Sequence, residues 1–180
     1  MATAGLIQNY FKLFGLQESY DLDLTELSSR YRNLQSAVHP DKFASASDQE
    51  RRLSVQQSAL INEAYQTLKN PLSRAQYMLK LRGGDISNDT SASMDSQFLM
   101  KQMQLREELE QVRGSDNPAS KLVVISKEIE QAIGEYETVL AEMFEKTGND
   151  SQDQISDYVR RMQFMVKLRQ EVESLEEQLL

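Results

Sequence analysis

The sequence of 180 residues contains no cysteine, no tryptophan and a single histidine, His39. Without cysteine the chain can form no disulfide and no thiolate metal site, and it has no cysteine nucleophile. A single histidine also excludes metal sites built from several histidines. We therefore expect no metal or other cofactor. The lack of cysteine is compatible with a reducing compartment, and we expect a cytoplasmic protein.

Glycine and proline are scarce as well, with seven and three residues. Few turn-forming residues argue against an all-β fold with its many tight turns. The longest apolar run, 122–125, is far too short for a transmembrane helix, and the first residues lack the basic and apolar parts of a secretory signal. These absences favour a soluble helical protein with no membrane partner.

The net charge of −8 is distributed unevenly. Residues 1–82 carry ten Lys and Arg against eight Asp and Glu, whereas residues 83–180 carry ten against twenty. The switch in sign suggests two units with different partners. Because nucleic-acid binding depends on Lys and Arg at the phosphates, the acidic half is a poor candidate for it. We expect no nucleic-acid partner.

Helical periodicity dominates the first half of the chain. Asp23 begins an apolar stripe that ends where Pro40 disfavours helix in the residue before it. The stripe consists of Leu24, Leu27, Tyr31, Leu34 and Val38. Three further helices are expected over about 10–14, 48–69 and 71–79, the second with an apolar face of Leu53, Leu60, Ile61, Ala64, Tyr65 and Leu68. Gly83-Gly84 ends the last one.

The second half opens with a small, polar segment at residues 83–97, which has the composition of a linker. Beyond it the apolar spacing predicts three longer helices: one over about 95–113, one from Asn117-Pro118 to Gly148, and one after Ser151. Three antiparallel helices with short loops form a small bundle. We therefore expect an all-α fold with a helical unit over 1–82, a linker over 83–97 and a three-helix bundle over 98–180.

The tripeptide His39-Pro40-Asp41 follows the first amphipathic helix. By itself it can be a simple helix stop, with a histidine cap and a turn-forming aspartate. Together with the short opening helix and the Asn70-Pro71 segment, however, it resembles the DnaJ-type J domain over about residues 9–80. The resemblance implies docking to a DnaK-type chaperone and stimulation of its ATP hydrolysis. The residues to which it assigns this role are His39, Pro40, Asp41, Arg30, Arg32 and Lys42.

Other features resemble one specialised J-protein family. The chain lacks a Gly/Phe-rich region and a Cys-x-x-Cys zinc module, whereas residues 41–44, residues 70–75 and the acidic helical tail resemble HscB proteins of iron–sulfur cluster biogenesis. This resemblance runs from Asn9 onward and leaves residues 1–8 unexplained. It implies two protein partners, an HscA-like chaperone and an IscU-like scaffold protein. The function implied is an adaptor that brings the two together for cluster transfer.

The helix expected over 95–113 has apolar side chains on two faces. Phe98, Leu105 and Leu109 form a core stripe, and the apolar residues on the opposite side either fill a second buried face or form a binding surface. The HscB resemblance implies a scaffold-binding surface made of Leu99, Met100, Met103, Glu107 and Phe164. Phe164 lies at the edge of the last apolar stripe, so a peripheral core role is an equal alternative for it.

The alternatives to the adaptor are an enzyme and a general J protein. An enzyme would have to use His39 with Asp41, or the helix carboxylates Glu107 and Glu108, and the sequence shows no nucleophile near them and no phosphate-binding glycine loop. We therefore expect no enzymatic activity. A general J protein that serves several folding clients is the main alternative. A narrow apolar face on one helix favours a single dedicated client.

Overall fold

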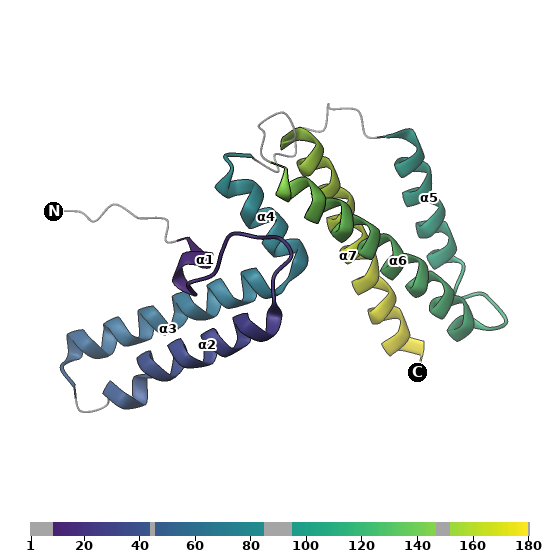
Figure 1. The fold of residues 1–180 in the computed structure, drawn as a ribbon. Helices are drawn as coiled ribbons and strands as arrows, with labels where there is room; N and C mark the ends of the chain where they lie inside the picture. Colours follow the sequence, from purple (N-terminus) through teal and green to yellow (C-terminus); the bar gives the residue numbers. More distant parts are fainter. Residues whose placement is uncertain (1–8, 44–45, 85–94, 147–151, 180) are drawn as a thin grey trace. The chain divides into compact units, whose positions relative to one another are not determined.

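The computed structural model describes residues 9–43, 46–84, 95–146 and 152–179. Every regular element in these ranges is helical, which confirms the prediction of an all-α fold (Figure 1). The elements are α1 (Tyr10–Leu13), α2 (Leu24–Val38), the 3₁₀ helix η1 (Pro40–Phe43), α3 (Asp48–Lys69), α4 (Pro71–Leu81), α5 (Ser96–Glu110), α6 (Pro118–Glu145) and α7 (Gln152–Leu179). None of the helices in the described ranges has the length and apolar content needed to span a bilayer.

Local capping chemistry sets where the helices begin. The Asp23 carboxylate accepts hydrogen bonds from the backbone N–H of Thr25 and Glu26 at 2.8 and 3.1 Å, so it satisfies donors that the first turn of α2 leaves open. Asn117 caps α6 in the same way, with Pro118 in the first turn. The predicted helix starts at these two positions are confirmed.

The chain divides into two compact units, Met1–Tyr77 and Met78–Leu180. The division falls within α4, a few residues before the boundary expected at residue 82. Most of the expected linker lies outside the described residues. The limits of 1–82 and 98–180 therefore stay a prediction.

In the first unit α2 and α3 lie antiparallel (Figure 1), and α1 packs against α3. Their core contains Phe11, Phe14, Tyr20, Leu27, Ile61, Ala64 and Leu68. The rings of Tyr10 and Tyr77 stack with centroids 4.5 Å apart, and the Tyr10 backbone N–H donates to the Tyr77 hydroxyl at 2.9 Å. Burial and a hydrogen bond to Glu63 raise the pKa of Tyr10 to about 12. These contacts fasten the short α1 to the unit.

Two leucines that the sequence places on core stripes are exposed. Leu24 is the first residue of α2, and Leu53 lies in the second turn of α3. Ser28 contacts Tyr65 near the end of α3, and Gln35 contacts Ser58 near the end of α2. Both leucines therefore lie where the overlap of the two helices runs out. The prediction that they belong to the core is wrong for this reason.

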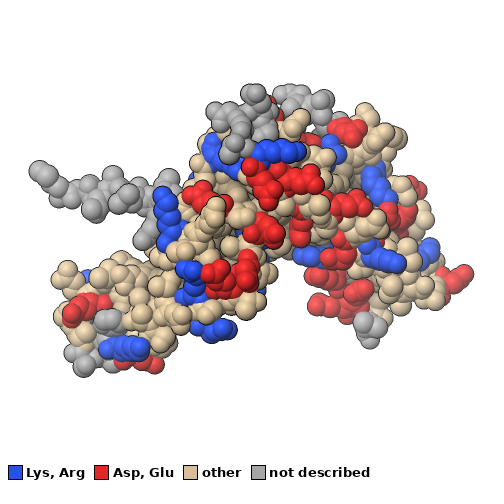
Figure 2. All heavy atoms as spheres, viewed as in Figure 1, with Lys and Arg blue, Asp and Glu red and all other residues tan. Residues whose placement is uncertain are grey.

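The second unit is a three-helix bundle. Helices α6 and α7 pair along their length (Figure 1), and α5 contributes Phe98, Leu105 and Val112 to the core. The buried side chains of the long pair are Leu122, Ile125, Ile129, Ile133, Leu140 and Phe144 from α6, and Ile155, Val159, Met162, Met165, Leu168, Val172 and Leu175 from α7. On the face shown in Figure 2, acidic side chains are spread over these bundle helices.

Candidate functional site

The His39-Pro40-Asp41 segment forms a well-defined turn between α2 and α3. His39 caps α2 with an extended backbone (φ −57°, ψ 127°), as expected for a residue that precedes proline. Its Nδ1 accepts a hydrogen bond from the Asp41 backbone N–H at 3.3 Å, and its carbonyl accepts one from the Lys42 N–H at 3.0 Å. The side chains of His39 and Asp41 are both exposed, so a partner can reach them on a turn that is already ordered.

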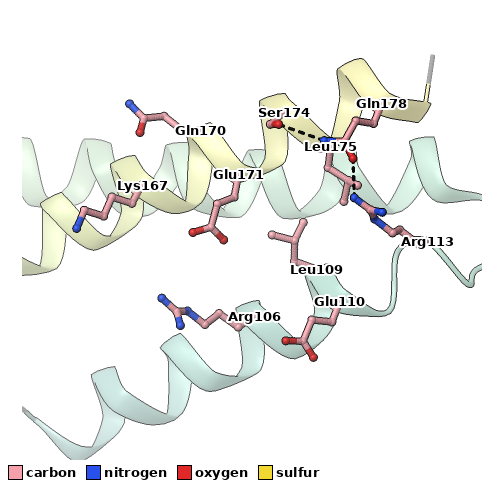
Figure 3. A pocket seen from close by; sticks show the side chains of 10 residues that line it. All are labelled: Arg106, Leu109, Glu110, Arg113, Lys167, Gln170, Glu171, Ser174, Leu175 and Gln178. Atoms are coloured by element: carbon pink, nitrogen blue, oxygen red, sulfur yellow. Dashed lines mark hydrogen bonds between the residues drawn. The ribbon is translucent and has the colours of Figure 1, made fainter.

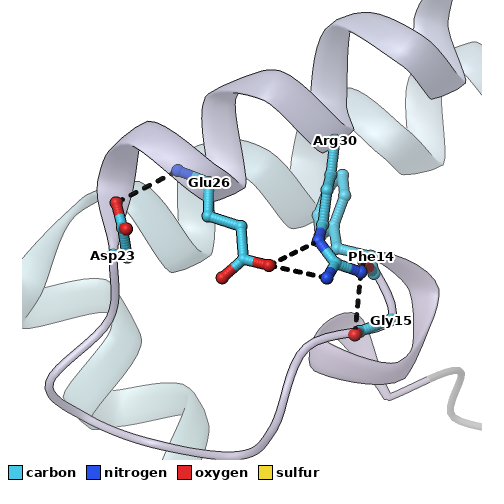
Figure 4. Close-up of polar contacts among 5 residues, drawn as sticks. All are labelled: Phe14, Gly15, Asp23, Glu26 and Arg30. Atoms are coloured by element: carbon cyan, nitrogen blue, oxygen red, sulfur yellow. Dashed lines mark hydrogen bonds and ion pairs between the residues drawn. The ribbon is translucent and has the colours of Figure 1, made fainter.

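The three basic residues assigned to this site differ in what they contact. Arg32 and Lys42 are exposed, and neither side chain has a hydrogen bond or ion pair within the described ranges. Arg30, in contrast, is half-buried and engaged within the first unit (Figure 4). Its Nη1 donates to the carbonyl oxygens of Phe14 and Gly15 at 2.8 and 2.9 Å.

The rest of the Arg30 guanidinium is engaged with Glu26. Its Nε and Nη2 donate to one carboxylate oxygen of Glu26 at 3.1 and 2.6 Å. Gly15, whose carbonyl accepts from Arg30, has φ +64°, a left-handed conformation that favours glycine. Arg30 therefore links α2 to the end of α1. The role of Arg30 as a chaperone contact stays a prediction, and little of its guanidinium is available for it.

Arg30→Met should lower the free energy of unfolding of the first unit by about 1–3 kcal/mol, because two carbonyls lose a charged donor. Hydrogen exchange at the α1 amides should become faster, since α1 would open more often. Arg32→Met, a matched change on the exposed part of α2, should shift stability by no more than about 0.5 kcal/mol. Equal exchange rates at α1 in both variants would contradict the linking role of Arg30.

The outer face of α5 carries the second candidate surface. Leu99, Met100 and Met103 expose 41%, 64% and 73% of their surface, while Phe98 and Leu105 on the inner side are buried. The alternative that the bundle buries a second face of this helix is therefore wrong for these three residues. Glu107 is also exposed, and its carboxylate accepts a hydrogen bond from Gln111 Nε2 at 3.2 Å. The result is an apolar strip with an acidic neighbour.

Phe164 on α7 packs at the edge of the bundle core, and its role in scaffold binding stays a prediction. Its ring meets that of Phe98 edge to face, with centroids 5.9 Å apart and planes at 82°. The Arg106 guanidinium lies 5.5 Å from the ring centroid. Phe164 is nevertheless only half-buried. It contacts Phe98, the residue before Leu99, and so lies at the edge of the core with part of its ring accessible.

A groove between α5 and α7 was not anticipated from the sequence (Figure 3). Its volume is about 630 Å³, and it is lined by Arg106, Leu109, Glu110, Arg113, Lys167, Gln170, Glu171, Ser174, Leu175 and Gln178. Arg113 donates to Gln178 Oε1 at 2.6 Å and closes one end. The lining residues repeat at helical spacing, but a solvated helix face has the same pattern. The groove becomes apparent only when α5 and α7 are packed together, so residue spacing alone does not predict it.

The described ranges contain no group of three or more His, Asp or Glu side chains placed to hold a metal ion. The two candidate surfaces instead offer an ordered polar turn with free basic neighbours and an exposed apolar strip. Both arrangements are suited to binding other proteins.

Comparison with known proteins places both units in described families. Residues 9–77 match the DnaJ domain, and residues 94–173 match the HSCB C-terminal oligomerisation domain. A co-chaperone protein HscB homolog of Shewanella loihica is 45% identical over 175 residues, covering 95% of this chain and 99% of the relative. One from Colwellia psychrerythraea is 44% identical over 171 residues, covering 95% and 98%.

Solved structures show the same relationship. The chaperone HscB from Vibrio cholerae matches with a TM-score of 0.80 and 43% identity, covering 96% of this chain and 99% of that one. The human co-chaperone protein HscB matches with a TM-score of 0.86 and 30% identity, covering 98% and 85%. With a J domain, an HSCB C-terminal domain and relatives that match at least 95% of its length, the chain belongs to the HscB family of J-domain co-chaperones.

Proposed function

We propose that this co-chaperone acts as an adaptor with two docking surfaces. The turn at His39 engages an HscA-like chaperone of the DnaK type and stimulates its ATP hydrolysis, and α5 presents an IscU-like scaffold protein to that chaperone for cluster transfer. The observation that carries the proposal is the apolar strip on α5, because a J domain alone does not account for it. The adaptor acts by bringing partners together, so it has no chemical step of its own, and we place its action in the cytoplasm.

The chaperone-docking surface consists of His39, Pro40, Asp41, Arg30, Arg32 and Lys42, of which Arg30 is largely engaged within the first unit. Pro40 restricts the backbone, so little conformational entropy is lost on docking. The exposed Asp41 carboxylate can accept two parallel hydrogen bonds from an arginine of the partner. Arg32 and Lys42 are free to attract an acidic surface and to accelerate association.

The scaffold-docking surface consists of Leu99, Met100, Met103, Glu107 and Phe164. Methionine side chains are flexible and polarisable, so they adapt to an apolar partner surface. An apolar centre with a charged rim is the usual composition of a specific protein interface. All but Phe164 lie on one helix, which supports a single dedicated client over a general J protein with many clients.

A comparison of the full chain with a fragment of residues 1–82 tests the adaptor. The fragment should fold and stimulate the chaperone's ATPase, because it contains the first unit with the Tyr10–Tyr77 contacts that hold α1. It should lose the additional stimulation that the scaffold protein gives with the full chain, since α5 is missing. The measurement is steady-state ATP hydrolysis by the chaperone, with and without scaffold.

Two results would count against the proposal. If the scaffold enhanced stimulation by the fragment as much as by the full chain, the second unit would not be the scaffold-binding part. If circular dichroism showed the fragment to be unfolded, the halves would form one cooperative unit, and residue 82 would be the wrong boundary.

A further inference from the structure

The contacts between α2 and α3 show which turn of α2 lies beside which turn of α3. The Tyr31 hydroxyl donates to Asn62 Oδ1 at 2.7 Å, and Gln35 Nε2 donates to the same oxygen at 2.6 Å. Ser58 Oγ then donates to Gln35 Oε1 at 2.9 Å. Because the helices are antiparallel, each step of one turn toward the end of α2 corresponds to a step of one turn toward the start of α3.

One further turn in the same direction leads to Val55. Positions 55, 58 and 62 are separated by three and four residues, so they share the face of α3 that meets α2. One turn beyond Gln35 are Val38, the last residue of α2, and its C-cap His39, so Val55 lies beside the His39-Pro40-Asp41 turn. The 3₁₀ helix that contains Asp41 also packs against α3. Val55 nevertheless exposes 54% of its surface, because α2 has ended.

The surroundings of Val55 are charged, with both signs present: Asp41 is exposed in the neighbouring turn and Asp48 at the start of α3. Arg51 lies one turn earlier on the same face of α3, where its guanidinium pairs with Asp48 and remains about half exposed. Lys42 is exposed in the neighbouring turn. An exposed branched apolar side chain beside the His39 turn, with charged side chains around it, has the composition of an interface centre and rim. Valine also has little rotamer freedom to lose when it is covered.

We propose that Val55 is part of the chaperone-docking surface, where it contacts an apolar segment of the DnaK-type chaperone. The contact extends the surface from the His39 turn onto the start of α3. This inference rests on the proposed function of that turn. It commits to the chaperone as the partner because Val55 is continuous with the turn that the proposed function assigns to that chaperone, through the packing of η1 against α3.

Leu53 offers a matched control two residues away. It exposes 51% of its surface, and two residues correspond to about 200° around a helix, so Leu53 points away from the α2 side on which Val55 lies. Truncation of either residue removes exposed atoms from the same stretch of α3. A general effect on the start of this helix should therefore be equal in both variants, whereas a docking contact affects only Val55.

The test measures the ATPase of a DnaK-type chaperone against the concentration of the full-length co-chaperone, for the parent, Val55→Ala, Leu53→Ala and His39→Gln. Val55→Ala should raise the concentration for half-maximal stimulation by roughly three- to tenfold, which matches the loss of one or two buried carbon groups. The maximal stimulation at saturation should stay at the parental level. Leu53→Ala should remain within about twofold of the parent, and thermal melts of both should match it.

Parental half-saturation for Val55→Ala would overturn the inference, and so would equal weakening by Leu53→Ala. If Val55→Ala melts early, Val55→Thr keeps the branched shape and volume but places a hydroxyl in the contact, and parental half-saturation for that variant would overturn the inference too. The His39→Gln variant distinguishes failure of the proposed function of the turn from failure of the inference about Val55. Full stimulation by His39→Gln would remove the proposed function of the turn and this inference with it, whereas an inactive His39→Gln with a normal Val55→Ala removes only the inference.

Discussion

Replacing His39 with glutamine should abolish stimulation of the chaperone's ATPase while the helical fold is retained. His39 occupies an exposed helix end, and its imidazole Nδ1 accepts the hydrogen bond that orders the backbone at Asp41. Glutamine is similar in size but cannot present an aromatic ring at that point. Because the side chain is exposed, the free energy of unfolding should change by less than about 0.5 kcal/mol. The readout is single-turnover ATP hydrolysis by the chaperone at saturating co-chaperone.

Binding of the scaffold protein is the internal control for this variant. His39 belongs to the first unit, whereas α5 belongs to the second, so the scaffold affinity of His39→Gln should equal that of the parent. A variant that loses both functions would indicate a folding defect, which far-UV circular dichroism would also detect. A variant that still stimulates the chaperone normally would show that the turn is not the functional element.

Helix boundaries were predictable because the signals for them are local. The Asp23 cap, the Asn117-Pro118 start and Gly83 with φ +78° involve backbone groups within a few residues of the side chain or glycine concerned. Sequence spacing contains that information directly. The exposed strip on α5 was predictable for a related reason. Residues on opposite sides of one helix are distinguished by their spacing alone, before any packing is known.

The contacts of Arg30 could not be predicted from the spacing of residues in the sequence. On α2 Arg30 looks like one more cation on a solvated face, as Arg32 does. Its partners are the carbonyl oxygens of Phe14 and Gly15, which lie in the turn after α1, about fifteen residues earlier. Only the packing of α1 against the rest of the unit brings them together. The spacing of residues within α2 therefore does not indicate the contact of Arg30 with these carbonyls.

The buried face of α6 also could not be predicted from residue spacing alone. The three- and four-residue spacing of apolar side chains on α6 predicts a stripe through Ala132, Tyr136 and Met143. These residues are half-buried, and Ile133 and Phe144 are buried instead. Helix α6 packs against both α5 and α7, so its buried face is wider than one stripe and its centre depends on both neighbours. The tyrosine still has a structural role, because its ring meets Tyr158 of α7 edge to face at 5.9 Å.

Simultaneous truncation of Leu99, Met100 and Met103 to alanine should weaken scaffold binding by orders of magnitude and leave chaperone stimulation in the absence of scaffold unchanged. All three side chains lie mainly in solvent, so their truncation removes interface area without opening a core cavity. Apolar anchors at interface centres often cost about 2 kcal/mol each when truncated, and about 1.4 kcal/mol corresponds to a tenfold change in affinity. Phe164 is left intact because its contacts with Phe98 and Arg106 would confound the result.

The matched control is Val123→Ala with Val124→Ala, two exposed apolar residues on α6 of the same unit. Isothermal titration with the scaffold should give parental affinity for this pair and strongly reduced affinity for the α5 triple variant. Both should melt at nearly the parental temperature, since exposed substitutions usually change stability by less than about 0.5 kcal/mol each. Buried positions would behave differently, because three large-to-small core changes at about 2–5 kcal/mol each would unfold so small a bundle. Parental scaffold affinity in the triple variant, or equal loss in the valine pair, would show that the α5 strip is not the specific docking surface.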